Sequence, residues 1–159
     1  EIEGRFQFSG IIGKSRAMEQ VCTLASKVID SDATVLLTGE TNLVRAGLDI
    51  MRRGPQYVVV KKGEHGALLF CSEGIFALPA YPLEEVKDPT GAGDAFAGGL
   101  MGYLASSGKR SLEAVKRGLT YGTVTASVAV EGFSVEPFSH FDQAALSERH
   151  DAFIRAIRF

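Results

Sequence analysis

The chain has 159 residues, of which 45% are hydrophobic and 23% are charged, and its net charge at pH 7 is −2. This length is enough for one domain with a sizeable core, and the small net charge gives no basic footprint for nucleic acid or for an anionic membrane. No apolar run approaches about 20 residues, so the sequence predicts no membrane-spanning helix. Two distant cysteines and three scattered histidines form no metal-ligand pattern, and buried thiols fit a reducing cytosol. We therefore expect a cytoplasmic protein without a metal site.

The N-terminal region begins with a short segment that is excluded from fold reasoning. Ile2-Glu3-Gly4-Arg5 matches the recognition site of a blood-clotting protease used to trim fusion proteins, so residues 1–5 are interpreted as a protease-site remnant. Ser15 is a suitable N-cap for a helix. Apolar residues follow it at helical spacing: Met18, Val21, Cys22, Ala25, Val28 and Ile29. Ala33–Thr38 is a short apolar run with β-branched residues, which predicts a buried strand.

Residues 6–40 resemble the sigma-54 activator ATPases of the AAA+ class, in which a Gly-Ile-Ile-Gly stretch, present here, leads into a helix, a strand and a phosphate loop. The loop pattern Gly-x-x-x-x-Gly-Lys-Ser/Thr would begin at Gly39. Its second Gly, its Lys and its Ser/Thr are replaced by Val44, Arg45 and Ala46. Val44 resists the positive φ angles that such a loop uses, and Ala46 cannot bind magnesium. We therefore expect no ATPase activity of the AAA+ type.

The segment after this missing loop predicts a helix and a further strand. Leu43–Arg53 has apolar residues at helical spacing, and Gly54-Pro55 stops the helix. Tyr57–Lys61 is predicted as a buried strand. Together with Ala33–Thr38 it would form a β-α-β unit with a right-handed crossover.

An edge hairpin and three helices are predicted in the rest of the chain. Ala67–Cys71 and Gly74–Leu78 flank a short turn and predict an antiparallel hairpin at a sheet edge. The helices are expected at Asp94 to about Ser107, Ser111 to Val130, and about Asp142 to Ile157. Three glycines of the first of these helices would let another backbone pack closely: Gly98, Gly99 and Gly102. Three phenylalanines are expected in the core and two histidines on the surface: Phe76, Phe96 and Phe133, and His140 and His150.

Residues 87–99, Lys-Asp-Pro-Thr-Gly-Ala-Gly-Asp-Ala-Phe-Ala-Gly-Gly, are the most informative segment of the chain. A turn, a run of small residues, a lone carboxylate and a helix start occur together there. A loop of this kind points several backbone N–H groups at one spot, where the helix dipole also favours negative charge. Asp94 then lies beside an anion site, as an enzyme needs when it takes a proton from an alcohol and steadies a phosphoryl group. The alternative is that Asp94 only caps or charges the helix start.

This segment resembles the signature of the ribokinase-like (PfkB) carbohydrate kinases, and the similarity extends from near Leu36 to about the end of the chain. The resemblance implies that Asp94 is the base that activates a sugar or nucleoside hydroxyl. It also implies an anion hole formed by the backbone of Gly91, Ala92 and Gly93.

The same resemblance implies nucleotide contacts on both sides of that segment, with MgATP as the cofactor. The Lys-Lys-Gly-Glu-His-Gly stretch at 61–66 matches a loop that covers nucleotide phosphates, and residues 122–135 resemble the wall on the adenine side. The residues assigned to the nucleotide on this basis are Lys61, Gly63, Gly66, Thr90, Ala126, Ala129 and Gly132. Two structural alternatives stay open, namely that the glycines only form a turn and that the small helix residues only serve packing.

The predicted fold is an α/β domain with three α/β/α layers and a Rossmann-like sheet, mostly parallel, with an antiparallel edge hairpin and a ribokinase-like C-terminal part. The string Leu36–Glu40 fits both families, so we interpret the chain as an artificial chimera. Residues 1–5 are the remnant, and residues 6–159 form a single domain. Within it, residues 6–40 would derive from the AAA+ protein and residues 41–159 from the kinase.

The predicted parent reaction is ATP-dependent phosphoryl transfer to a sugar or nucleoside hydroxyl. Positioning supplies much of the catalysis in such a transfer, and the family places its sugar site mainly in an N-terminal half that has no counterpart in this sequence. We therefore expect weak or absent turnover, with binding of ATP or ADP as the most that survives. A homodimer is also expected, with exchange of segments as one form of it, because a shortened sheet exposes an edge strand. Two alternatives are a folded chimera without biochemical function and, disfavoured by the missing phosphate loop, a fragment of a sigma-54-type transcription regulator.

Overall fold

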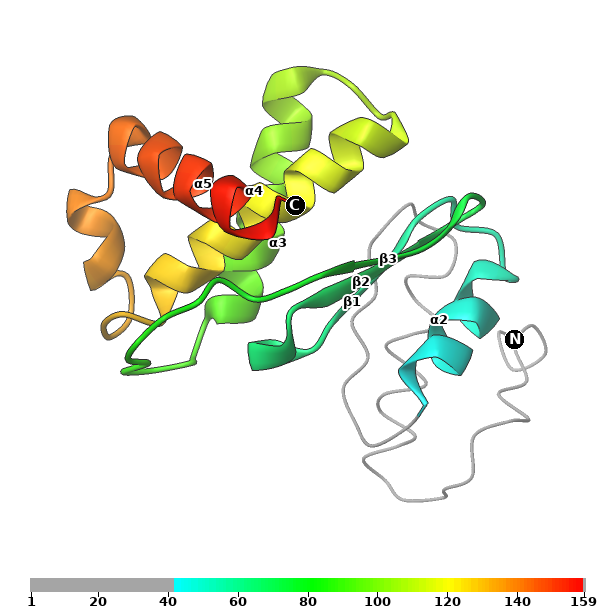
Figure 1. Cartoon of the computed structure of the whole chain (residues 1–159), viewed down its shortest axis with the longest axis horizontal. Helices are drawn as coiled ribbons and strands as arrows, with labels where there is room; N and C mark the ends of the chain where they lie inside the picture. Colours follow the sequence, from blue (N-terminus) through cyan, green and yellow to red (C-terminus); the bar gives the residue numbers. More distant parts are fainter. Residues whose placement is uncertain (1–41, 159) are drawn as a thin grey trace, which may run out of the picture. The chain divides into compact units, whose positions relative to one another are not determined.

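The computed structural model describes residues 42–158, drawn in colour in Figure 1. In chain order the elements are α2 (Leu43–Met51), β1 (Val58–Lys61), η1 (Gly63–His65), β2 (Ala67–Cys71), β3 (Gly74–Leu78), α3 (Ala92–Ser107), α4 (Leu112–Ala129), η2 (Glu136–His140) and α5 (Gln143–Ile157), where η marks a short 3-10 helix. The predicted helix after Ser15, the predicted strand at Ala33–Thr38 and the whole segment 6–40 lie outside the described residues.

The described residues belong to two compact units. The first unit contains residues 42–60 and 70–73, and the second contains residues 61–69 and 74–158. The boundary between the units runs through the strands, so β1 and β2 each contribute residues to both. Each unit is therefore described by itself.

The first unit combines α2 with the buried part of β1. Asn42 caps α2, because its side-chain oxygen accepts a hydrogen bond from the Arg45 N–H at 3.1 Å. Gly47 is buried, and the ring of Phe70 occupies the space where a Cβ on this glycine would stand. Residues 58–60 of β1 are all buried valines, as expected for the continuous apolar run of a strand covered on both faces.

The strands form a sheet with the order β1-β2-β3 and antiparallel neighbours. The hairpin of β2 and β3 has the predicted bounds, Ala67–Cys71 and Gly74–Leu78. A hydrogen bond from the Lys62 N–H to the Gly66 carbonyl oxygen, at 2.7 Å, closes the connection between β1 and β2. The parallel pairing that was predicted with Ala33–Thr38 lies outside the described residues.

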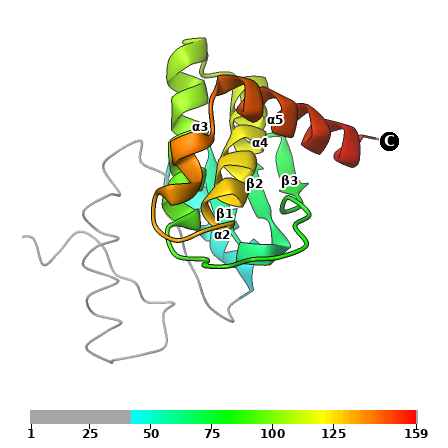
Figure 2. The same ribbon diagram turned by 90° about the vertical axis from the view of Figure 1, so that its left-hand side faces the viewer.

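Helices α3 and α4 pack against each other in the second unit (Figure 2). Glycines at the contact have no room for a Cβ because atoms of the other helix are in the way: Gly99, Gly118 and Gly122. A Cβ on Gly122 would lie 2.7 Å from the Phe96 carbonyl oxygen. Thr125 adds a hydrogen bond across the contact, since its hydroxyl donates to the Ala95 carbonyl at 2.8 Å. The predictions of close packing at Gly99 and of a buried Phe96 are confirmed.

Several predictions about single residues are wrong. A Cβ on Gly98 or Gly102 would meet no atom within 4 Å, because these glycines lie on the exposed side of α3. Phe133 is 64% exposed, since it follows the end of α4 in an irregular loop. The side chain of His150 is only 15% exposed, because its ring stacks on Tyr121 with a centroid distance of 4.1 Å.

Helix α5 contacts α4 through His150 and Arg149, and its Phe153 packs against Tyr81. Phe153 is fully buried, and its ring centroid lies 5.6 Å from that of Tyr81. Arg149 donates hydrogen bonds to the Ser127 hydroxyl at 3.2 Å and to the Glu131 carboxylate at 3.0 Å. These contacts hold α5 over the second half of α4.

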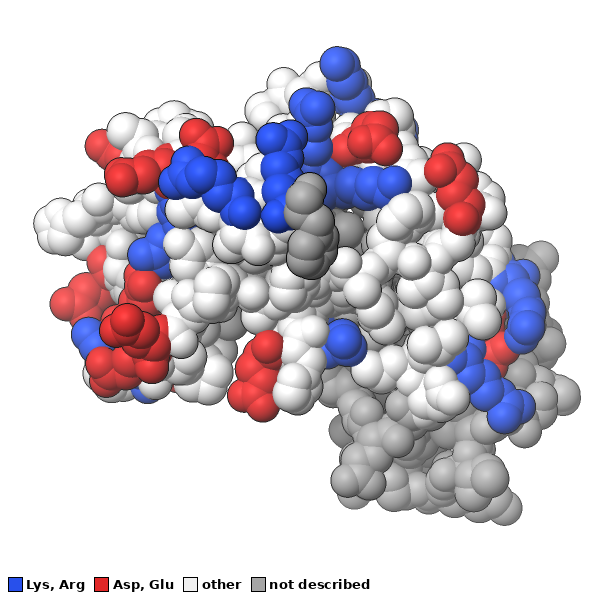
Figure 3. Space-filling view, in the orientation of Figure 1, with Lys and Arg blue, Asp and Glu red and all other residues white. Residues whose placement is uncertain are grey.

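The surface carries charges of both signs. On the face drawn in Figure 3, lysines and arginines and also aspartates and glutamates are visible, with uncharged surface between the groups. Among the helices of residues 42–158, none combines the length and the apolar character that a membrane span requires.

Candidate functional site

The segment before α3 is fixed at both ends by backbone hydrogen bonds. The N–H groups of Lys87 and Asp88 donate to the Val130 carbonyl oxygen at 2.8 and 3.3 Å, which ties the segment to the end of α4. The Asp88 carboxylate accepts the Thr90 N–H at 2.9 Å and so forms an Asx turn. Hydrogen bonds from the side chain and the backbone of Thr90 hold the pKa of Asp88 below its ordinary value.

The first turn of α3 begins at Gly91. This residue has the left-handed φ of +80° that favours glycine, and its carbonyl oxygen accepts the N–H groups of Asp94 at 3.0 Å and Ala95 at 2.9 Å. Within residues 42–158, the N–H groups of Gly91 and Gly93 have no backbone acceptor. Asp94 is exposed on the same turn. Backbone donors and a carboxylate therefore lie together at a helix N-terminus, where the dipole favours an anion.

Lys61, the last residue of β1, contacts this turn. Its ammonium nitrogen donates a hydrogen bond to the Gly93 carbonyl oxygen at 2.7 Å and lies 5.9 Å from the centroid of the Phe96 ring. Partial burial lowers the pKa of Lys61, and the negative charge of Asp94 opposes that shift. The site thus holds a cation, a carboxylate and backbone donors within one turn of helix.

The loop after Lys61 needs both of its predicted glycines for conformational reasons. Gly63 and Gly66 have φ values of +59° and +81°, and the Gly66 N–H donates to the Gly63 carbonyl at 3.1 Å. A Cβ on Gly66 would also lie within 2.8 Å of the Pro79 and Ala80 backbone. Their turn geometry thus accounts for both glycines, whether or not the loop also binds a phosphate.

The residues predicted for the adenine side lie around the end of α4, next to the Val130 carbonyl. Ala126 is half-buried and Ala129 is buried. A Cβ on Gly132 would lie 2.8 Å from Pro137 Cγ, so packing alone explains a small residue there. The Val130 carbonyl binds the segment before α3, so this end of α4 is next to the first turn of α3. We call residues 91–93, where the anion hole is predicted, the anion turn.

Two features of the site were missed by sequence reasoning. The contact of Lys61 with Gly93 joins residues 32 positions apart, and nothing in either local sequence indicates it. The second feature is the Val130 carbonyl, a backbone group at a helix end. Such a carbonyl has no hydrogen-bond donor within its helix, but the sequence does not indicate which group donates to it. Among residues 42–158, no group of three or more His, Cys, Asp and Glu side chains is arranged to hold a metal ion.

Comparison with known proteins gives one consistent family. Residues 25–136 match the pfkB family carbohydrate kinases. The 5-dehydro-2-deoxygluconokinase of Photobacterium profundum is 34% identical over 105 residues, which cover 66% of this chain and 30% of the relative. The aminoimidazole riboside kinase of Salmonella typhimurium is 35% identical over 95 residues, or 60% of this chain and 28% of the relative. The chain therefore spans about a third of the length of these curated relatives.

Solved structures share the fold. A crystal structure of aminoimidazole riboside kinase from Salmonella enterica superposes with a TM-score of 0.65 at 24% identity, over 93% of this chain and 50% of that one. Fructokinase from Vibrio cholerae superposes with a TM-score of 0.71 at 24% identity, over 84% of this chain and 46% of that one. The predicted ribokinase-like α/β fold is confirmed.

The family match begins at residue 25, inside the segment 6–40, so the kinase similarity reaches further towards the N-terminus than the predicted start near Leu36. The origin of the earlier residues from an AAA+ protein stays a prediction. The match nevertheless covers most of the sequence, including the loop after Lys61, the turn before Asp94 and the end of α4. The chain belongs to the pfkB family of carbohydrate kinases.

Proposed function

We propose that this chain carries the phosphate-binding and proton-accepting side of a kinase that transfers a phosphoryl group from ATP to a hydroxyl of a sugar or nucleoside. The observation that carries the proposal is the first turn of α3. It presents the exposed Asp94 carboxylate beside the N–H groups of Gly91 and Gly93, which have no backbone acceptor within residues 42–158. A proton acceptor and an anion site on one rigid turn are what this reaction needs.

In the proposed step, the hydroxyl oxygen of the acceptor attacks the γ-phosphorus while the bond from that phosphorus to the β-phosphate oxygen breaks and ADP leaves. The Asp94 carboxylate takes the hydroxyl proton. The N–H groups of Gly91 and Gly93 stabilise the negative charge of the phosphoryl oxygens. Ala92, the third residue predicted for the anion hole, lies between them, and its N–H donates to the Pro89 carbonyl at 3.3 Å. Magnesium enters with ATP as part of the substrate and neutralises phosphate charge.

We assign the nucleotide to the surface formed by the loop after Lys61, Thr90 and the end of α4. The residues are Lys61, Gly63, Gly66, Thr90, Ala126, Ala129 and Gly132. Two solved structures with the same fold support a nucleotide as the ligand: the Salmonella enterica enzyme was solved with aminoimidazole riboside and an ATP analogue, and the Vibrio cholerae enzyme with fructose, ADP and calcium. The low turnover and the homodimer expected from the sequence stay predictions, so nucleotide binding is measured before transfer.

The test compares wild type with Asp94→Asn. MgATP is titrated by calorimetry, and transfer from ATP is then assayed with ribose, fructose, cytidine and aminoimidazole riboside as acceptors. Asp94→Asn keeps the size of the side chain but removes the base, so MgATP binding should persist while kcat falls about a hundredfold to ten-thousandfold. Glu148→Gln, an exposed change on α5, is the matched control and should behave as wild type.

A second variant tests the anion turn. Gly93→Asp places a negative charge where phosphate oxygens would bind, so MgATP binding should be lost while a cooperative melt remains. The proposal is wrong if wild type gives no heat with MgATP, or if Asp94→Asn transfers phosphate at the wild-type rate. A protein that melts cooperatively but binds no nucleotide would favour the alternative of a folded chain without biochemical function.

A further inference from the structure

We infer that Lys61 is a positioning residue that acts through the Gly93 carbonyl and holds the anion turn in register with the Asp94 carboxylate. The inference rests on the proposed function and deepens it. The structure shows the ammonium nitrogen 2.7 Å from the Gly93 oxygen, across 32 positions of sequence. This contact joins the end of β1 to the first turn of α3, both within the second unit.

The location of this cation at a helix N-terminus carries a cost that its neighbours have to offset. A helix N-terminus already carries positive partial charge, so a nearby ammonium is repelled by it, and ordering a lysine side chain costs conformational entropy. Lys61 is also partly buried, and this burial lowers its pKa. The Gly93 carbonyl, the Phe96 ring and the Asp94 charge compensate for these costs.

This inference revises the role given to Lys61 on the proposed nucleotide surface, because the direction of its contact indicates positioning of the turn rather than direct binding of a phosphate. Carbonyl groups in a helix point towards its C-terminus and N–H groups towards its N-terminus. The ammonium on the Gly93 carbonyl is therefore one peptide group behind the N–H groups that would face a phosphate. It can fix the turn without occupying the place of the ligand.

The contact also sets the spacing between two segments that the proposed function assigns to the nucleotide. Lys61 comes two residues before Gly63, and Gly93 belongs to the anion turn, so one hydrogen bond holds the loop and the turn together. A Cβ on Gly93 would lie 2.8 Å from the Lys61 nitrogen, so Gly93→Ala displaces the ammonium at the end of its flexible side chain. Lys61 and Gly93 are thus expected to act as one unit.

The test uses the full chain with four variants, Lys61→Met, Lys61→Arg, Gly93→Ala and the double variant Lys61→Met/Gly93→Ala. Lys109→Met is the control, since it removes the same charge from an exposed loop. Thermal melts report folding, and Gly93→Ala is expected to fold because alanine is the better helix former. The kinetic readouts are kcat and KM for MgATP, with the best acceptor of the wild-type assay.

We expect Lys61→Met and Gly93→Ala each to lower kcat about tenfold or more, because a small misplacement of catalytic groups is costly. KM for MgATP should stay within about threefold, and the double variant should lose little beyond either single variant. Lys61→Arg should recover part of kcat, and Lys109→Met should match wild type.

Three results would overturn the inference. A raised KM with unchanged kcat would make Lys61 a direct nucleotide ligand. Additive losses in the double variant would show that the two residues act separately. An unchanged kcat in Gly93→Ala would show that displacing the ammonium has no effect on transfer. This variant tests the inference on its own, also when Lys61→Met does not fold. Failure of the proposed function is distinguishable, because wild type would then show neither MgATP binding nor transfer, and the inference would fall with it. A wild type that binds MgATP but transfers to none of the acceptors would overturn the inference alone, because no transfer would then depend on the position of the turn.

Discussion

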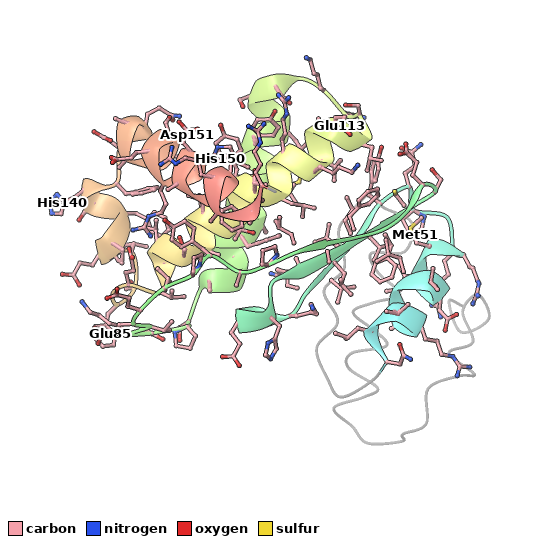
Figure 4. All side chains as sticks on the ribbon, viewed as in Figure 1. Met51, Glu85, Glu113, His140, His150 and Asp151 are labelled. Carbon is pink, nitrogen blue, oxygen red and sulfur yellow. The ribbon has the colours of Figure 1, made fainter. Side chains whose placement is uncertain are left out.

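His150 lies in surroundings that favour the neutral imidazole ring. It stacks on Tyr121, and its Nε2 atom lies 2.8 Å from the Thr120 hydroxyl. That hydroxyl donates to the Arg117 carbonyl at 2.7 Å, so it is left to accept a hydrogen bond from the ring nitrogen. Burial lowers the pKa of His150, and the Asp151 carboxylate, 3.9 Å from Nδ1, opposes that shift. The labels in Figure 4 show both residues on α5, with His140 separate from them on η2.

Stability should therefore fall as the solution is acidified. An unfolded histidine titrates near about pH 6.5, whereas the pKa of folded His150 is lower. Between these two pKa values the unfolded chain binds more protons than the folded one, so acidification stabilises the unfolded chain and lowers the free energy of unfolding. Urea unfolding at about pH 7.5 and about pH 5.5 should show this loss, and His150→Gln should reduce it. His140→Gln is the control at an exposed site. An unchanged pH dependence in His150→Gln would contradict the assignment.

At the scale of the elements, the contact between α3 and α4 depends on glycine. A helix interior normally disfavours glycine by about 1 kcal/mol relative to alanine. The chain nevertheless carries it at Gly99, Gly118 and Gly122, where a Cβ would overlap the other helix. Because glycine has no side chain, the backbones of α3 and α4 can approach each other closely here. This approach brings the Thr125 hydroxyl within hydrogen-bond distance of the Ala95 carbonyl.

Two alanine substitutions should change stability in opposite directions. Gly122→Ala places a methyl 2.7 Å from the Phe96 carbonyl oxygen, and the resulting overpacking, about 1–3 kcal/mol, should exceed the gain in helix propensity. Gly98→Ala faces open space and should stabilise the protein by up to about 1 kcal/mol. Urea unfolding midpoints with unchanged slope measure both effects. Equal shifts would show that propensity, and not packing, governs these positions.

The sequence was enough to predict the helices and the hairpin. Ser111 and Asp142, the predicted first residues of two helices, are the N-caps of α4 and α5 and accept the N–H groups of Ala114 and Ala145. The short helix η2 was missed, because five residues are too few for a helical period to be visible. Phe133 was misplaced for a related reason: hydrophobicity favours burial, but no regular element carries this residue into a core.

The candidate site could be predicted only in part. Asp94 and its small neighbours are contiguous in sequence, so the turn and its chemistry could be identified from their order. The contact of Lys61 with Gly93 joins residues 32 positions apart, so it is a tertiary effect that no local pattern carries. The half-buried His150 was missed for the same reason, since Tyr121 and Thr120 reach it from another helix.

At the scale of the whole molecule, all residues proposed to bind nucleotide fall in the second unit. They come from residues 61–66, 90–94 and 126–132, and α2 contributes none of them. A ligand that binds only the folded form of this unit stabilises it by mass action. The proposed function therefore has a thermodynamic signature that does not depend on an acceptor or on turnover.

MgATP should raise the temperature of the calorimetric transition that includes the second unit. At a concentration about a hundred times Kd, the expected stabilisation is about 2.7 kcal/mol. Gly93→Asp should melt at the same temperature with and without MgATP. Stabilisation of both proteins by the same amount would contradict binding at the anion turn. The same conclusion would follow if magnesium chloride without ATP raised the melting temperature of wild type as much as MgATP does.

The Val130 carbonyl has a consequence for dynamics, because one oxygen atom holds the two N–H groups of Lys87 and Asp88. Fraying of the last turn of α4 releases both groups in a single event, so their amide hydrogens should exchange with solvent as a correlated pair. The turn that precedes Asp94 then loosens whenever that helix end opens. A ligand that orders this turn would slow the opening of the end of α4. The amide hydrogens of Lys87 and Asp88 would then exchange more slowly, so their exchange rates would report whether the site is occupied.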